Sequence, residues 1–245
     1  MSRSSEGIVA GRRAAVEAVR AGSAREVLVA EGARPTESLR GLLRACREAG
    51  VPVAEVPRQC LDAFAADHRG VVVRLRDAPE MGERQVASWP FGDEDVVVVL
   101  DGVVDPQNLG AAARSAEAAG AVMLVSRLRR AAAPSPAAIR ASAGALLYLP
   151  HARVANIARV LARLKDAGFW VVGLDEDASA TVYAGRCPQG RVAVVLGSEG
   201  EGLSRLVREA CDTLVSLPMH GRVGSLNASA ALAAVLYAYV LPSRR

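Results

Sequence analysis

Short apolar runs alternate with amphipathic stretches along this chain, and the two patterns predict strands and helices respectively. Five apolar runs predict buried strands, at residues 96–100, 122–125, 169–174, 192–196 and 213–217. Helical spacing predicts helices in LGAAARSAEAAG after the first run and at about 136–143, 154–167, 203–210 and 226–240. This alternation predicts an α/β fold with a mostly parallel sheet and helices on both of its faces.

The first 76 residues predict a smaller α/β unit of their own. Val16 and Val19 share one face of a helix, and a second helical stripe runs from Leu39 to Cys46 and ends at Gly50. Strands are predicted at 27–29, 51–56 and 70–75. Residues 77–94 combine Pro, Gly and charges without a period, which is typical of a linker. The predicted division is therefore 1–76, a linker at 77–94, and 95–245.

The charge of the chain is concentrated in the first unit. The 245 residues carry a net charge of +4, and residues 1–76 hold 13 Arg against 9 Asp and Glu. The remainder holds 17 basic and 17 acidic residues, so the whole excess lies in the N-terminal unit. This asymmetry favours a polyanionic partner. The richness in Arg and Ala, with Lys165 as the one lysine, is also what a GC-rich genome produces.

Several classes of protein are disfavoured. The longest apolar run, 228–241 with one serine, is shorter than the roughly 20 residues of a membrane-spanning helix. The N-terminus has no signal-like apolar core, which predicts a cytoplasmic protein. The spacing of the four Cys and three His residues fits no metal site and predicts reduced, mostly buried thiols. Only 4% of residues are aromatic, which disfavours a base-stacking platform for single strands.

Three polar loops, 101–110, 197–202 and 218–227, each follow a predicted strand and precede a helix. Loops at the carboxyl ends of parallel strands share one edge, so we expect them to form one site. The second loop lacks the dinucleotide order of glycines, and Glu199 and Glu201 would repel a pyrophosphate. The loop suits adenosine that carries a cationic sulfonium, and equally a plain tight turn. No hydrolase elbow surrounds Ser198 or Ser225, and His220 as a base for Ser225 is disfavoured.

The three loops resemble the motifs of the SpoU/TrmH class of SPOUT methyltransferases. In order, these are DGVVDPQNLGAAARSA (101–116), VLGSEGEGL (195–203) and LPMHGRVGSLNASA (217–230). Further similarity, in RASAGAL (140–146) and GRRAAVEAVRAG (11–22) for example, extends it over nearly the whole chain. The chain is most similar to the bacterial 23S rRNA guanosine 2′-O-methyltransferase subfamily.

The resemblance implies S-adenosylmethionine as cofactor, a C-terminal trefoil knot, an L30e-like N-terminal RNA-binding domain and a homodimer, with no metal and no DNA. Residues that match family positions divide into three groups. The catalytic group is Asn108, Arg114, Glu199, Ser225 and Asn227; the cofactor group is Gly197, Leu217, Met219 and Leu226; the RNA-binding group is Arg12, Arg13 and Arg114.

We hypothesise that Arg114 binds an RNA phosphate and polarises the 2′-OH, while Ser225 and Asn227 orient it. Gly110, one turn before Arg114, is expected to allow close approach. Other interpretations remain: Arg114 and the Arg12–Arg13 pair as solvated residues, Asn108 as a helix cap, Glu199 as a cap or a support for the third loop, and Ser225 and Asn227 as caps of the last helix.

The expected substrate is 23S rRNA, since the reaction uses the 2′-OH that DNA lacks. The shared motifs leave open a tRNA or an antibiotic-resistance site in rRNA. A non-catalytic RNA-binding or ribosome-assembly protein is the alternative of another class, and the intact polar residues of all three motifs disfavour it. The last helix, apolar on all sides, is expected to be buried in the domain or in a subunit interface.

Overall fold

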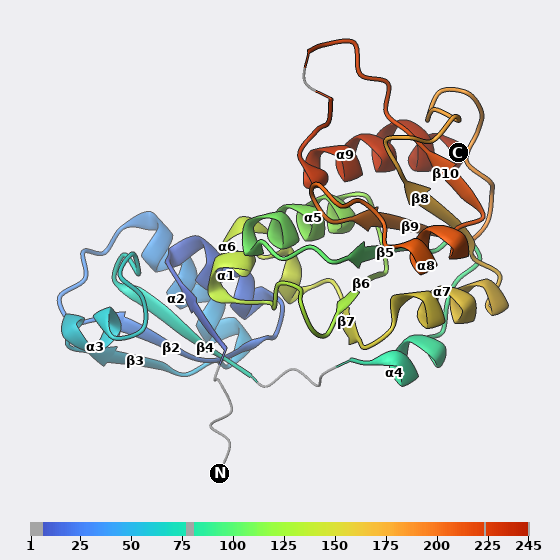
Figure 1. The fold of residues 1–245 in the computed structure, drawn as a ribbon. Coiled ribbons are helices and arrows are strands. Elements are labelled where there is room, and N and C mark those ends of the chain that lie inside the picture. The colour runs from blue at the N-terminus through green and yellow to red at the C-terminus, as the bar shows by residue number, and fades with distance from the viewer. Residues whose placement is uncertain (1–6, 77–80, 223, 245) are drawn as a thin grey trace.

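The computed structural model describes residues 7–76, 81–222 and 224–244, and it contains two β-sheets (Figure 1). The first sheet has four strands in the order β1-β4-β2-β3. Its β2 and β3 are parallel, whereas β4 runs antiparallel to both β1 and β2. The elements of this N-terminal unit are β1 (Ile8–Ala10), α1 (Arg12–Arg20), β2 (Ala24–Ala30), α2 (Glu37–Ala49), β3 (Val53–Val56), α3 (Arg58–Asp62) and β4 (Val71–Leu75).

Helix α2 follows the sequence pattern closely. The side chain of Thr36 accepts a hydrogen bond from the backbone N–H of Leu39 and caps the start of the helix. Gly50 ends it with φ of 65°, a left-handed conformation that costs glycine little. Leu39, Leu42 and Cys46 are buried against the first sheet, so the predicted apolar stripe is confirmed.

The second sheet has six parallel strands in the order β10-β8-β9-β5-β6-β7. All residues of the central strands β5 and β9 are buried, as their continuous apolar runs predict. The predicted parallel sheet is therefore confirmed. The strands are β5 (Val96–Asp101), β6 (Met123–Arg127), β7 (His151–Val154), β8 (Trp170–Leu174), β9 (Val192–Gly197) and β10 (Thr213–Val215).

Helices cover both faces of this sheet. One apolar core joins the sheet to α5 and α9, and the other joins it to α4, α7 and α8. Gly110 of α5 permits a close helix crossing, since a Cβ there would lie 2.4 Å from the carbonyl oxygen of Ala138 in α6. The helices are α4 (Glu83–Ala87), α5 (Pro106–Ala118), α6 (Pro136–Ala141), α7 (Ile157–Asp166), α8 (Arg205–Ala210) and α9 (Ala228–Val235), followed by wider and tighter helical turns at Leu236–Val240 and Leu241–Arg244.

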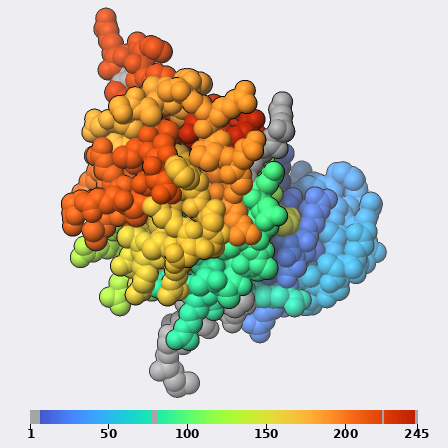
Figure 2. Space-filling view, turned by 90° about the vertical axis from the view of Figure 1, so that its right-hand side faces the viewer, coloured from blue at the N-terminus to red at the C-terminus, as the bar shows by residue number. Residues whose placement is uncertain are grey.

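The structure departs from the sequence prediction in several places, and β1 and α3 of the N-terminal unit were among the elements not predicted. Strand β7 was not predicted, because HARV alternates buried and half-buried residues over only four positions. Helix α7 begins at Ile157, three residues later than predicted, where the Asn156 side chain caps it. Part of the predicted linker is ordered structure: Val86 of α4 is buried in the second unit, and the green segment of α4 lies against the yellow α7 (Figure 2). Residues 77–80 of that linker lie outside the described residues.

The N-terminal unit is docked on the second unit through α6 and the residues that follow it. Ile139 of α6 is buried in the core of the first unit. The hydroxyl of Tyr148 donates to the Glu17 carboxylate at 2.6 Å, and Arg140 pairs with Asp67 at 3.2 Å. Burial and the Glu17 carboxylate raise the pKa of Tyr148 to about 12. Mixed apolar and polar contacts of this kind hold the two units in a defined orientation.

The segment after β8 crosses the end of β10. The N–H of Val182 donates to the carbonyl of Ser216, and the N–H of Ser216 donates to the carbonyl of Ala180. The trefoil knot implied by the resemblance stays a prediction. In the described part of the chain, none of the helices combines the length and the apolar character needed to cross a bilayer. Cys46 and Cys187 are buried, whereas Cys60 is exposed, and all four cysteines are free thiols.

Candidate active site

A pocket of about 480 Å³ lies at the carboxyl ends of β8, β9 and β10. Its walls come from residues 174–177 after β8, 196–203 around the end of β9, and 215–217, 219 and 224–228 at and after the end of β10. The second and third polar loops therefore converge, as predicted. The first loop is outside the pocket wall, and it reaches the site through Asn108 in the first turn of α5.

Asn227 joins the three loops. Its side-chain Nδ2 donates to Asn108 Oδ1 at 2.9 Å and to Glu199 Oε1 at 2.8 Å. Its Oδ1 accepts from the backbone N–H of Ser229 at 3.1 Å, which caps α9. Asn227 thus acts as a cap and as a bridge, and the predicted capping role is confirmed for this residue.

Asn108 does not cap α5, and Glu199 does not cap α8. Asp105 caps α5 through Gln107 N, so the alternative of Asn108 as the cap is wrong. Asn108 is instead buried, with its amide oxygen on Asn227. Glu199 also accepts from the backbone N–H of Ala228 at 3.4 Å. Glu199 therefore supports the third loop, while α8 begins at Ser204 without a side-chain cap.

The second loop is a tight backbone turn. Ser198 and Gly202 exchange two backbone hydrogen bonds of 3.0 Å each. Gly200 and Gly202 have φ values of 82° and 66°, which other residues rarely adopt. A Cβ on Gly197 would lie 2.1 Å from the carbonyl carbon of Gly202. Glycine at position 197 is therefore required for the turn to close over the end of β9.

The pocket wall combines apolar side chains with acidic ones. Leucines at 174, 196, 217 and 226 and Met219 supply apolar surface, whereas the carboxylates at 175–177, 199 and 201 supply negative charge. The Arg208 guanidinium lies 3.0 Å from Asp175 and balances one of them. This surface suits a ligand with a flat apolar part and a cationic centre, and it disfavours a polyphosphate.

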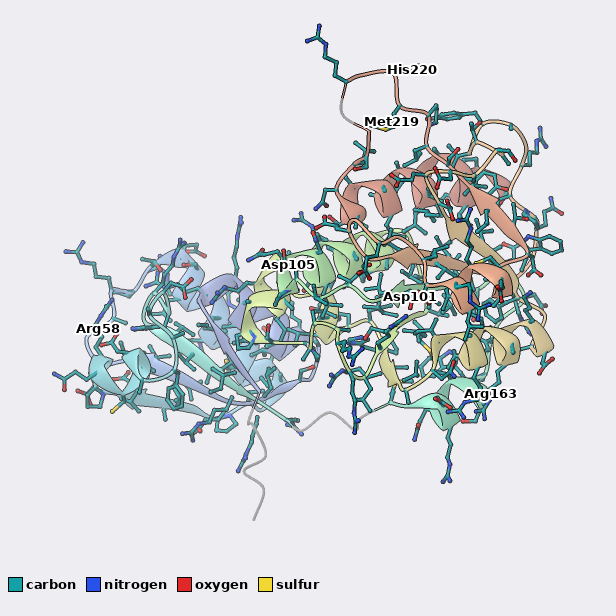
Figure 3. The ribbon with its side chains drawn as sticks, viewed as in Figure 1. Arg58, Asp101, Asp105, Arg163, Met219 and His220 are labelled. Atoms are coloured by element: carbon teal, nitrogen blue, oxygen red, sulfur yellow. The ribbon has the colours of Figure 1, made fainter. Side chains whose placement is uncertain are left out.

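Apart from Arg114, the remaining residues predicted to bind the cofactor or act in catalysis lie on the third loop. Leu217, Met219, Ser225 and Leu226 all line the pocket. Ser225 is exposed, and within the described residues it is not hydrogen-bonded to Asn108, Glu199 or Asn227. His220, labelled in Figure 3 beside Met219, is exposed on the part of this loop that projects from the unit.

Arg114 is separate from the bridge formed by Asn227. It is exposed on α5, outside the pocket wall, and the helical rise places it about 9 Å along the axis from Asn108. The expectation that Gly110 allows a ligand near Arg114 is wrong, because Gly110 packs against α6. The position of Arg114 leaves its guanidinium accessible to a large ligand.

The two arginines predicted to bind RNA differ in their surroundings. Arg12 donates to the hydroxyl of Thr36 at 2.5 Å and lies near that of Ser38 at 3.4 Å, so it joins α1 to the start of α2. Arg13 is exposed on α1. Of the two, Arg13 has the side chain that is free of these intramolecular contacts.

Sequence reasoning missed Asp101, the last residue of β5. Its side chain is fully buried, and its Oδ1 accepts from Arg127 Nε at 2.7 Å. Its Oδ2 accepts from the backbone N–H of Ser204 at 2.8 Å. Asp101 therefore ties the second loop to the end of β6. The sequence does contain a signal for this residue, because Asp101 is a charged residue at the end of a strand whose other residues are all apolar.

Comparison with protein families assigns both units. Residues 95–237 match the SpoU rRNA methylase family, and residues 8–81 match the family described as RNA 2′-O ribose methyltransferase substrate binding.

Among similar proteins, a 23S rRNA (guanosine-2′-O-)-methyltransferase RlmB from Photobacterium profundum is 38% identical over 83% of this chain and 84% of its own. An uncharacterized tRNA/rRNA methyltransferase from Mycolicibacterium vanbaalenii is 41% identical over 94% of this chain and 74% of its own. The SpoU methyltransferase AviRb from Streptomyces viridochromogenes, solved with AdoMet, has a TM-score of 0.80 at 29% identity and covers 97% of this chain and 90% of its own. The predicted family is confirmed: this chain belongs to the SpoU rRNA methylase family of RNA methyltransferases.

Proposed function

We propose that this protein transfers a methyl group from S-adenosylmethionine to the 2′-OH of a guanosine ribose in 23S rRNA. The observation that carries the proposal is the Asn227 bridge to Asn108 and Glu199 at the mouth of a ligand-sized pocket. The RlmB relatives support the guanosine and the 23S rRNA.

The residues of the pocket fit S-adenosylmethionine. The leucines and Met219 offer apolar surface to an adenine, and the close turn at Gly197 presents backbone groups to it. The carboxylates on the wall attract a sulfonium cation. When bound, this cofactor supplies an electrophilic methyl group. The AdoMet complex of the structurally similar AviRb supports the assignment.

The polar residues around the pocket take complementary roles in methyl transfer. Asn227, fixed by Asn108 and Glu199, holds the third loop so that Ser225 lies on the pocket wall and orients the acceptor ribose. Arg114 binds the adjoining phosphate from α5 and polarises the 2′-OH, so that the hydroxyl proton can pass to solvent. Positioning of this kind contributes about 7–11 kcal/mol in well-oriented reactions.

The N-terminal unit binds the RNA, with Arg13 as a phosphate contact. Its match to the substrate-binding family and the concentration of positive charge in residues 1–76 support this role. The protein acts in the cytoplasm as a homodimer. The last helix supports the dimer: Leu232 and Val235 are buried, whereas Tyr237 is 52% exposed beside exposed Ala238. The apolar surface that this leaves is suited to a second copy.

Two measurements test the proposal. Isothermal titration with S-adenosylmethionine should show binding at one site per chain, and absence of binding would reject the enzyme. Mapping of 2′-O-methyl groups in total RNA from cells with and without the gene should show one guanosine of 23S rRNA losing its methyl group. Loss of a methyl group from tRNA would instead favour the second candidate, a tRNA methyltransferase, which relatives described as tRNA/rRNA methyltransferases support.

A further inference from the structure

A second cavity, of about 510 Å³, lies where β6 and β7 end. We call it the arginine cavity. Residues 127–130 after β6 form one wall, residues 155–158 at the start of α7 form another, and Ser204, Leu206 and Val207 at the start of α8 complete it. These lining residues include three arginines and no carboxylate. The cavity therefore attracts anions.

Two of the three arginines have no ionic partner among the residues that the structure describes. Arg127 is held by the buried carboxylate of Asp101, with Nη2 at 2.5 Å from Oδ1. Arg129 and Arg130 are exposed, and neither forms an ion pair with any described residue. The carbonyl of Leu128, just before them, accepts from Arg153 at 2.9 Å, which anchors the turn. The two free guanidinium groups are thus presented from a supported loop.

The start of α7 adds to the same attraction. This helix has 10 residues, and Ile157 and Ala158, its first two, belong to the cavity wall. Asn156 caps the N–H of Arg159, and the Glu83 carboxylate, which pairs with Arg159, accepts from the backbone of Asn156. The N–H groups of Ile157 and Ala158 are left without partners inside the helix. Such helix ends bind phosphate groups readily. A helix N-terminus and two unpaired arginines therefore act on one volume.

Apolar side chains on the wall narrow the class of ligand. Leu128 is 39% exposed and Leu206 is 56% exposed, and both line the cavity. An inorganic anion would gain nothing from these side chains. A nucleotide would, because its phosphate binds arginine while its base packs on leucine or stacks on a guanidinium plane.

The residues of the arginine cavity are connected through the chain both to the active-site pocket and to the helix that contacts the N-terminal unit. Asp101, labelled in Figure 3, binds Arg127 on one side and the N–H of Ser204 on the other, and Gly202 and Leu203 just before Ser204 belong to the active-site pocket. On the other side, the chain runs from Arg130 to α6, whose Ile139 is buried in the N-terminal core. An RNA that contacts both the N-terminal unit and the active-site pocket can therefore reach this cavity as well.

We propose that the arginine cavity binds a nucleotide of the RNA substrate that neighbours the methylated one. Arg129 and Arg130 hold its phosphate, and Leu128 and Leu206 contact its base. This inference rests on the proposed function, because it takes the ligand to be the RNA that the enzyme methylates.

The test compares R129A/R130A with the control R84A/R186A, which removes the same charge from exposed arginines outside both cavities. Arg127 is left intact because it pairs with buried Asp101. For transcribed 23S rRNA, we expect Kd and KM to rise on the order of tenfold or more in R129A/R130A, with kcat and cofactor affinity retained. The logarithm of the RNA association constant decreases with log salt, and the magnitude of this slope should fall by about 0.7–0.9 for each phosphate that the variant no longer binds. The control should change Kd by less than about twofold, as surface charges act weakly.

Three outcomes are decisive. Equal RNA affinity of R129A/R130A and the control would overturn the inference. Displacement of the RNA by millimolar guanosine monophosphate in the wild type, but not in R129A/R130A, would support it, because the nucleotide and the RNA would then compete for the arginine cavity. If the wild type methylates no ribose, the proposed function fails, while the Kd comparison still measures whether the cavity binds RNA.

Discussion

The side-chain nitrogen of Asn227 lies 2.8 Å from the carboxylate oxygen of Glu199. The two residues are 28 positions apart and come from loops that follow different strands. The same nitrogen donates to Asn108, so the three motif loops meet at one amide. An amide that donates to two acceptors and also caps a helix fixes the mouth of the pocket without any charge of its own.

Replacement of Asn227 by Asp separates these roles. The carboxylate retains an oxygen for the cap of α9, but it places a second oxygen against Asn108 Oδ1 and Glu199 Oε1, where no donor remains. We expect N227D to lower kcat about 100-fold through misplacement of the loop. N227A also loses the cap and about 1 kcal/mol of stability.

The control for Asn227 is S135A, which removes a comparable cap from α6 outside the pocket. Methyl transfer to rRNA and urea unfolding together measure both effects. S135A should lose stability and keep activity. Full activity of N227D would show that the bridge has no role in the reaction.

Replacement of Gly197 by Ala should prevent the second loop from closing. The new Cβ would lie 2.1 Å from the carbonyl carbon of Gly202, and backbone yields less readily than a side chain. We expect a loss of stability of about 1–3 kcal/mol and a large loss of S-adenosylmethionine binding, measured by thermal unfolding and calorimetry. G185A, where a Cβ meets nothing within 4 Å, is the control. Unchanged cofactor binding in G197A would contradict the predicted role of this glycine.

Removal of the Asp101 carboxylate should destabilise the structure around both cavities. D101A leaves Arg127 and the N–H of Ser204 without their buried acceptor, and we expect a loss of about 3 kcal/mol, since breaking a buried pair is costly. D101N keeps one acceptor and should lose less. D93N is the control, because Asp93 is fully exposed beside Arg191 and such pairs contribute little. Equal midpoints of urea unfolding for D101A and D93N would reject this role.

His151 should make the protein less stable in acid. Burial, and then the nearby Arg153 charge, lower the pKa of His151 from 6.5 to about 4. Between these values the unfolded chain binds a proton that the folded protein does not, so the free energy of unfolding falls as the pH falls. The expected loss from pH 6.5 to 4 is up to about 3 kcal/mol, and this residue contributes little slope above about pH 7.5, where it is neutral in both states.

The measurement for His151 is urea unfolding across this pH range in the wild type and in H151Q. The variant lacks the hydrogen bond between His151 Nε2 and Ser126 Oγ, which lie 2.8 Å apart, so its stability is expected to be lower at pH 7. Its pH dependence should nevertheless be shallower. Parallel curves for the two proteins would show that His151 is not the titrating group.

Much of the fold was predictable because strands and helices that are buried need apolar residues in runs or at regular spacing, and these are visible in the sequence. The run Val96–Leu100 predicts a strand covered on both faces, and β5 is buried throughout. Glycine at position 50 predicts the end of α2, because the residue that caps it has φ of 65°. The predicted meeting of the second and third loops follows from parallel strands, whose carboxyl ends share one edge. By contrast, β7 and α4 are short and half-polar, so their burial comes from neighbours distant in sequence.

The sequence by itself determined the family, the parallel sheet of the second unit and the residues of the three motifs, because periodicity and motif order are local properties of the chain. Only the tertiary structure decided which contacts each of these residues makes, and therefore which role it has. It made Asn227 the bridge, placed Gly110 against α6, left Arg114 exposed outside the pocket, and paired Asp101 with Arg127. A hydrogen bond or ion pair depends on which atoms come within about 3 Å, and between residues far apart in sequence only packing of the whole chain sets that distance.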